Sequence, residues 1–216
     1  GLAALALTDH DGVYGVPKAY WEKKKHPALK LICGASLSLP GGHRLTLLAE
    51  NRAGYGRLCR LLTKSHEGKE KGAACLDWEE LANLPGDSGL LALAPASLDF
   101  HRLHFPGPTY LTLQRLLDGR DSERTEKALW LSRRWRLPLV ATNDVHYHLP
   151  ERQSLQDTLT AIRENAPLSA LGHKLFPNRE RHLKSSAEMR ALFRDLPEAV
   201  HTTLEIAARC SFCPSE

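Results

Sequence analysis

The stretch LAALALTDHDG, residues 2–12, passes from an apolar run into two aspartates and a histidine. A short apolar run that ends at Thr8-Asp9-His10 and an Asp-Gly pair is typical of a buried strand followed by a turn. We therefore expect a strand over residues 2–7, with a polar cluster at its carboxyl end.

Short apolar runs alternate with helical patterns through the rest of the first 141 residues. We expect further strands at 29–33, 44–49, 89–94, 110–113 and 137–141, and helices at 16–25, 54–65, 77–84 and 122–135. Strands that are apolar on both faces and alternate with helices predict an α/β fold with a parallel sheet or barrel. Ligands in such folds bind at the carboxyl ends of the strands.

A second polar cluster, residues 143–146, follows the last expected strand. Asp144 and His146 are two residues apart, a spacing that puts both side chains on one side of an extended segment. Carboxylate and imidazole donors suit Zn, Mn or Fe, and a metal so held activates water for phosphoester hydrolysis. Either cluster alone is an ordinary turn sequence. Two clusters at strand ends favour a metal site formed by His10, Asp144 and His146, with Asp9 close by.

The chain changes character after about residue 150. We expect helices at 153–164, from 185 to about 194, and at 197–210, and no further strands. Ser185 and Glu188 have capping-box spacing, and Pro197 suits the first turn of a helix. The interpretation is an α/β domain at 1–150 followed by a helical extension at 151–216.

Composition excludes several classes of protein. Hydrophobic residues make up 42% of the 216 residues, which excludes a disordered segment. No apolar run approaches the roughly 18 residues that span a membrane. Five cysteines, sparse and odd in number, fit a reducing cytoplasm, and a net charge of +4 does not by itself indicate nucleic-acid binding. The start lacks Met and opens inside an apolar run, so we expect an N-terminally truncated fragment.

Residues 130–136 place two tryptophans among arginines. Trp130 and Trp135 in this setting suit contact with bases and phosphates. The alternative, which we favour, is a solvated helix face with both tryptophans packed inward.

Three blocks carry a resemblance to a known family. Residues 5–15 (LALTDHDGVYG) resemble the second metal motif of PHP domains, the domains named after polymerases and histidinol phosphatase. Residues 45–51 (LTLLAEN), followed by Gly54-Tyr55, resemble the family's next block, and 140–147 (VATNDVHY) resembles its last metal motif. With the later stretches, such as 181–185, the chain is similar to the PHP domain of bacterial C-family DNA polymerases of the DNA polymerase III alpha-subunit type, closer to their error-prone branch.

The resemblance implies a distorted (β/α)7 barrel, here incomplete at the N-terminus, and a helical connection towards the polymerase palm region. It implies a divalent metal (Zn, Mn or Mg) at the strand ends, and Mg for the parent polymerase. The implied parent is a nucleotidyltransferase in DNA replication and damage-tolerant synthesis, whose partners are DNA and other replication or translesion proteins. The fragment contains no candidate palm carboxylates, so we expect no polymerase activity from it alone.

Several positions depart from the family's metal motifs. Ser36 stands in place of a Glu, Arg44 in place of a His, and residues 94–96 (APA) in place of a Cys or His. His43 is one residue away, and a one-residue slip on a strand turns a side chain to the opposite face. We therefore expect a degenerate metal site and a structural role. The alternatives are a free-standing metal-dependent PHP phosphoesterase or 3′–5′ exonuclease, and a non-enzymatic interaction barrel.

Overall fold

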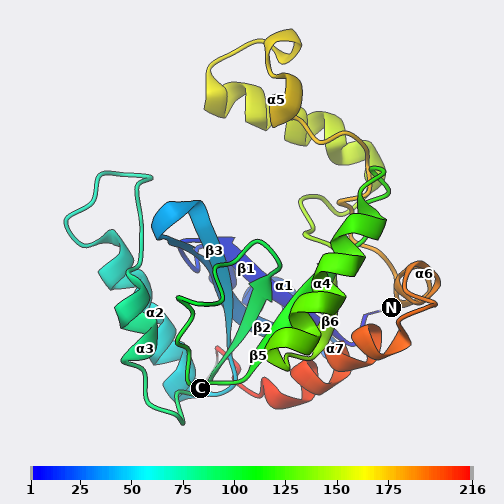
Figure 1. The fold of residues 1–216 in the computed structure, drawn as a ribbon. Coiled ribbons are helices and arrows are strands. Elements are labelled where there is room, and N and C mark those ends of the chain that lie inside the picture. The colour runs from blue at the N-terminus through cyan, green and yellow to red at the C-terminus, as the bar shows by residue number, and fades with distance from the viewer. Residues whose placement is uncertain (1, 215–216) are drawn as a thin grey trace.

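The computed structural model describes residues 2–214, and a six-stranded sheet in the order β1-β2-β3-β4-β5-β6 forms its centre (Figure 1). The strands are β1 (Ala4–His10), β2 (Lys30–Leu39), β3 (His43–Ala49), β4 (Leu90–Pro95), β5 (Thr109–Gln114) and β6 (Leu139–Thr142). Strand β3 is antiparallel to both of its neighbours, and the other neighbouring pairs are parallel. The sheet forms a half-barrel, which confirms an incomplete α/β barrel.

Strand β3 reverses direction because a three-residue turn, Pro40–Gly42, joins it to β2. Gly41 and Gly42 have φ of 81° and 76°, the left-handed region that glycine enters without strain. Two neighbouring strands joined by so short a turn have to be antiparallel, since a parallel connection needs a crossover of about a dozen residues. The expectation of a parallel sheet therefore holds for the other strands and not for β3.

Helices lie where the helical patterns predict them, with ends that shift by a few residues. They are α1 (Val16–Lys23), α2 (Arg52–His66), α3 (Trp78–Ala82), α4 (Asp121–Trp135), α5 (Gln153–Glu164), α6 (Ser186–Leu192) and α7 (Pro197–Arg209). The capping box is formed: the backbone N–H of Glu188 donates to Ser185 Oγ at 3.3 Å, and the N–H of Ser185 donates to Glu188 Oε2 at 2.7 Å.

Both faces of the central strands are buried, and consecutive residues pack on opposite faces. On one face, Leu47 and Ala92 belong to the cluster that includes Leu58 of α2 and Ala128 of α4. On the other face, the packing partner is α7, and the cluster consists of Ile32, Leu48, Leu91, Tyr110, Val140, Ile206 and Cys210. Cover on both faces is the physical reason for the near-continuous apolar strands.

Strands β1 and β2 extend past their expected ends. The parallel pairing continues to His10 opposite Ser36, and β2 runs on to Leu39. The hydrogen bonds of this pairing outweigh the turn tendency of Thr8-Asp9-His10. Because neighbours on a strand face opposite sides, Asp9 and His10 are directed to different faces of the sheet.

Two of the three α-helices after residue 150 are placed differently with respect to the sheet. Helix α7 packs against the sheet, whereas α5 and the loops around it stand away from the sheet as an arm (Figure 1). Residues 150–214 form no β-strand. An isolated parallel β-bridge pairs Tyr147 with His182. No helix between residues 2 and 214 is long and apolar enough to cross a membrane.

Candidate functional site

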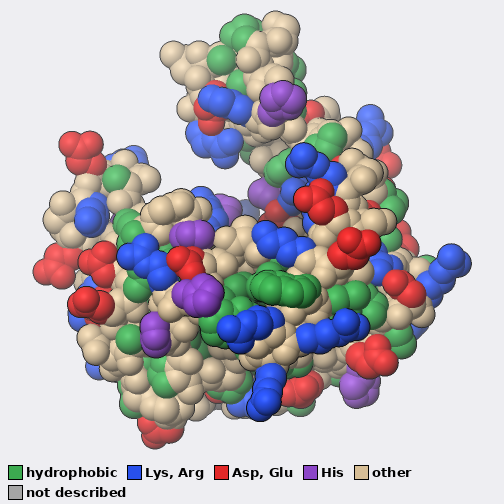
Figure 2. All heavy atoms as spheres, viewed as in Figure 1, with side chains coloured by type: hydrophobic (Ala, Val, Ile, Leu, Met, Phe, Trp, Pro, Cys, Tyr) green, Lys and Arg blue, Asp and Glu red, His purple; other side chains and the backbone are tan. Residues whose placement is uncertain are grey.

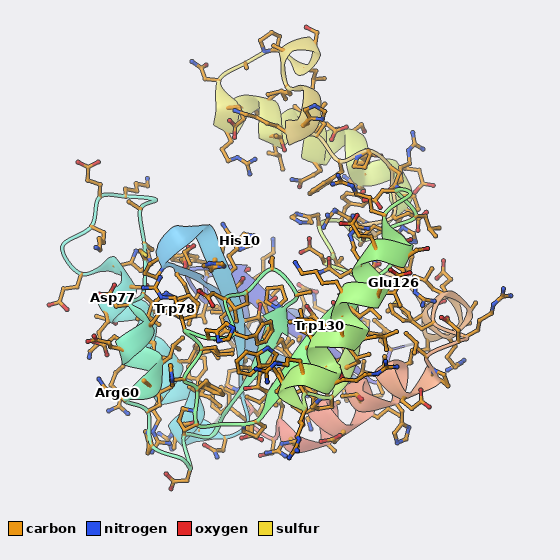
Figure 3. The ribbon with its side chains drawn as sticks, viewed as in Figure 1. His10, Arg60, Asp77, Trp78, Glu126 and Trp130 are labelled. Atoms are coloured by element: carbon orange, nitrogen blue, oxygen red, sulfur yellow. The ribbon has the colours of Figure 1, made fainter. Side chains whose placement is uncertain are left out.

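Of the four predicted ligands, His10 lies at the carboxyl end of β1, and Asp144 and His146 follow the carboxyl end of β6. These are the two edge strands, and the curvature of the half-barrel brings their ends towards each other. His146 Nε2 lies 3.6 Å from Asp144 Oδ2, and both groups influence the pKa of His10 electrostatically. Figure 3 shows His10 at the end of the sheet that faces the α5 arm.

Asp9 is held in a different interaction. Its Oδ2 accepts a hydrogen bond from the backbone N–H of Gly15 at 2.6 Å, immediately before α1. This contact supports the turn between β1 and α1, and it follows from the strand alternation that directs Asp9 away from His10. The structure therefore does not bring Asp9 to the other three side chains.

Arg44 engages the imidazole of His10. Its Nη1 contacts His10 Nδ1. An arginine has no acceptor, so Nδ1 must carry the lone pair in this contact. Burial and the charge of Arg44 both lower the pKa of His10, which favours the neutral form of its ring. His43, one residue earlier, packs its ring 5.8 Å from that of Trp78, so it is directed elsewhere.

Arg181 engages the carboxylate of Asp144 in an ion pair. Burial opposes ionisation of Asp144, but its hydrogen bond with His146 and the charge of Arg181 hold its pKa below the usual value. The Arg181 guanidinium also lies 4.3 Å from the centre of the Phe176 ring. The sequence gives no direct signal for this role beyond the family-like stretch at 181–185.

Backbone contacts fix Arg181 beside the Asp144–His146 segment. The Asn143 side-chain amide donates to the carbonyls of Glu180 at 2.9 Å and His182 at 2.7 Å. The backbone N–H of His146 donates to the carbonyl of Arg181 at 2.9 Å. These bonds place the arginine as part of the site, although 37 residues separate it from Asp144.

Asp11, the remaining acid near His10, forms hydrogen bonds that join the end of β1 to β2. Its Oδ1 accepts from the backbone N–H of Ser38 at 2.7 Å, and its Oδ2 accepts from Ser38 Oγ at 2.8 Å. His66 Nε2 lies 2.7 Å from the backbone carbonyl oxygen of Asp11. Both oxygens of the Asp11 carboxylate are thus already hydrogen-bonded at the junction of β1 and β2.

The side chains present do not fit a metal cluster. Guanidinium groups already contact one nitrogen of His10 and the carboxylate of Asp144, and a divalent cation there would meet two permanent positive charges. Ser36 is a poor substitute for a carboxylate ligand, and the end of β4 has only Ala94 and Pro95. Within residues 2–214, no three His, Cys, Asp or Glu side chains are grouped so that they could hold a metal ion.

Comparisons with known proteins agree with this architecture. The PHP domain family matches residues 1–127. The chain is 39% identical over 226 aligned residues to a protein of Dechloromonas aromatica named error-prone DNA polymerase, and 41% identical over 224 residues to one of that name from Methylococcus capsulatus. Each alignment covers 100% of this chain but only 22% and 21% of the relative. A Pseudomonas fluorescens protein of the same name is 38% identical over 98% of the chain and 21% of its own length.

Proposed function

This chain belongs to the PHP domain family, and on that premise we propose that it is the PHP portion of an error-prone C-family DNA polymerase. The similarity to proteins of that name continues through residues 128–216, beyond the segment that the family itself matches. The chain spans about a fifth of the length of these relatives. The complete protein would be a nucleotidyltransferase that uses Mg²⁺ and DNA in replication and damage-tolerant synthesis.

Within that polymerase the domain has a structural role, and its metal site is degenerate. The contact between Arg44 and His10 is the observation that carries this proposal. Nδ1 accepts from the guanidinium, so the neutral imidazole carries its proton on Nε2 and offers a metal no free lone pair. The pairing of Arg181 with Asp144 supports the same conclusion at the other edge of the sheet. His10, Asp144 and His146 then stabilise the junction of β1, β6 and the 176–182 loop.

The helical part at 151–216 connects the barrel domain at 1–150 to the rest of the polymerase. Helix α5 supports this, because it buries Thr160 and exposes an apolar stripe of Leu155, Leu159 and Ile162. These three side chains are 48%, 53% and 70% exposed and recur at i, i+4 and i+7 on one face. An apolar stripe that faces solvent is typical of a contact surface. Its partner is the remaining four-fifths of the polymerase chain.

The test compares two sets of changes in the longer polymerase that carries this domain. Substitution of His10→Ala, Asp144→Asn or His146→Ala should leave primer extension within about twofold, because no polymerase step passes through this cluster. Substitution of the three α5 residues by Gln should reduce extension or the stability of the whole protein. Loss of extension after Asp144→Asn in a protein that remains folded would contradict the structural role.

A further inference from the structure

Helix α4 carries a tryptophan whose side chain is not packed in the core. Trp130 is 63% exposed, and it points away from the sheet in Figure 3. Trp135, five residues on, packs 6.0 Å from Phe100 and 5.1 Å from His101, measured between ring centroids. The expectation that both tryptophans pack inward is therefore confirmed for Trp135 and wrong for Trp130.

Three cations surround Trp130 on the same face of the helix. Lys127 precedes it by three residues, and Arg133 and Arg134 follow it by three and four, the spacings that bring helical side chains together. Glu126, four residues before Trp130, is the one acidic side chain at these spacings, so the cations around the indole outnumber it three to one. All three cations are exposed. In Figure 2, seen from the same side, Lys and Arg side chains border an apolar patch over α4.

These cations have no carboxylate partner. None of the three forms an ion pair with any residue from 2 to 214. Arg134 lies 5.2 Å from the centre of the Trp135 ring, a contact that leaves its charge without a counter-ion. Arg124, nearer the start of the same helix, is instead paired with two aspartates. Positive charge that can meet an anion therefore gathers at the carboxyl-terminal half of α4, around the indole.

We propose that Trp130, Lys127, Arg133 and Arg134 form a binding surface for single-stranded nucleic acid. The indole offers a face on which a base can stack, and the two guanidinium groups offer forked donors for phosphate oxygens. A hydrophobic protein partner fits this face less well, because Trp130 is the one large apolar side chain exposed along α4, every residue of which is described. Phosphates complement the charges that lack a carboxylate, and bases complement the single aromatic ring.

The surface is separate from the Asp/His cluster. Helix α4 ends at Trp135 and leads into the amino end of β6, whereas Asp144 and His146 follow the carboxyl end of that strand. The seven-residue rise from Lys127 to Arg134 spans only about 10 Å, so the contact covers a few nucleotides. Binding at this surface needs no metal and no polymerase chemistry.

Trp21 supplies a matched control on α1. It is also 63% exposed and lies in a lysine-rich segment. However, Lys24 Nζ already lies 3.9 Å from the centre of its ring, and Lys25 is paired with Glu22. One face of this indole is thus covered by the residue that follows its own helix, so we expect it to contribute little to base stacking.

Fluorescence anisotropy with a labelled 20-nucleotide oligo-dT, in EDTA, tests the proposal on this 216-residue chain. Trp130→Ala should weaken binding at least fivefold, consistent with about 1–3 kcal/mol per stacked base. Trp130→Phe should retain most of the affinity, and Trp21→Ala should leave it unchanged. Arg133→Ala with Arg134→Ala should weaken binding and make the slope of log affinity against log salt shallower by about 0.7 for each phosphate that the variant no longer neutralises.

Two results would overturn the proposal. One is the absence of salt-dependent binding by the unaltered chain up to millimolar protein. The other is binding that Trp130→Ala leaves unchanged, or that Trp21→Ala weakens equally, since either means that charge alone attracts the DNA. Circular dichroism should show that all variants remain folded, because the substituted side chains are exposed. Because the assay contains EDTA, the binding that it measures needs no metal and no polymerase activity. A negative result would therefore not bear on the proposed polymerase role.

Discussion

The guanidinium of Arg44 on β3 reaches across β2 to Nδ1 of His10 on β1. Ser36 faces His10 in the intervening strand and Ser38 faces Arg44, so only small side chains separate them along this path. A cationic group thus occupies the side of the cluster where the family's metal motif has a histidine. The proposed degenerate site therefore predicts that the charge at position 44 governs the affinity for a metal.

Arg44→His should raise the affinity for Zn²⁺ at least tenfold. The change removes a permanent positive charge and adds a nitrogen donor beside His10. Isothermal titration calorimetry with Zn²⁺ measures it. Arg44→Met is the matched control, because it removes the charge without adding a donor, and it should give a smaller gain. Equal Zn²⁺ affinity in the unaltered chain and in Arg44→His would show that Arg44 does not close the site.

Alanine substitutions at two glycines of α2 should change the stability of the fold in opposite directions. A Cβ on Gly54 would lie 1.8 Å from the backbone carbonyl oxygen of Gly89, whereas one on Gly56 meets nothing within 4 Å. Gly54→Ala should lower the free energy of unfolding by about 1–3 kcal/mol, because α2 must move away from the backbone at Gly89. Gly56→Ala should raise it by about 0.5–1 kcal/mol. Urea unfolding measures both, and similar values for the two would contradict the close packing of α2 on Gly89.

Acid should weaken the start of α4 through Asp118. A hydrogen bond from Arg124 lowers the pKa of Asp118 to about 2. Because the folded pKa lies below the unfolded value of about 4, this pair stabilises the fold above that pH. The contribution is lost as the pH falls towards 2. NMR titration of Asp118 should show its pKa rising in Arg124→Met and staying low in Arg120→Met, in which the backbone contact of residue 120 remains. An unchanged pKa in Arg124→Met would be inconsistent with the pair.

The apolar stripe of α5 should be dispensable for the stability of this chain. Leu155→Gln, Leu159→Gln and Ile162→Gln together should change the melting temperature little, because exposed substitutions each cost within about 0.5 kcal/mol. Leu131→Ala on α4, whose side chain is 7% exposed, should cost about 2–5 kcal/mol. Differential scanning calorimetry compares them. A large loss from the α5 triple variant would mean that the stripe packs within the domain.

The order of strands, helices and caps could be predicted because local patterns decide it. The apolar runs, the Ser185–Glu188 spacing and Pro197 all lie where the structure uses them. The meeting of His10 with Asp144 was also predictable, since residues after parallel strands gather at one edge of a sheet.

Other features depend on contacts that local patterns do not reveal. Thr8-Asp9-His10 has the composition of a turn, but pairing with β2 extends the strand and turns Asp9 away from His10. Arg181 reaches Asp144 through backbone bonds between segments 37 residues apart. The exposure of Trp130 depends on which face of α4 meets the sheet, and the mixed pattern of arginine and tryptophan left that open.

We propose that Arg44 and Arg181 keep metal ions out of the Asp/His cluster and leave this chain without nuclease activity. The most direct measurement is the cleavage of 5′-labelled single-stranded DNA by this chain in excess Mn²⁺, compared with His146→Ala. We predict no cleavage above background and no difference between the two proteins. Robust Mn²⁺-dependent cleavage that His146→Ala abolishes would contradict the claim.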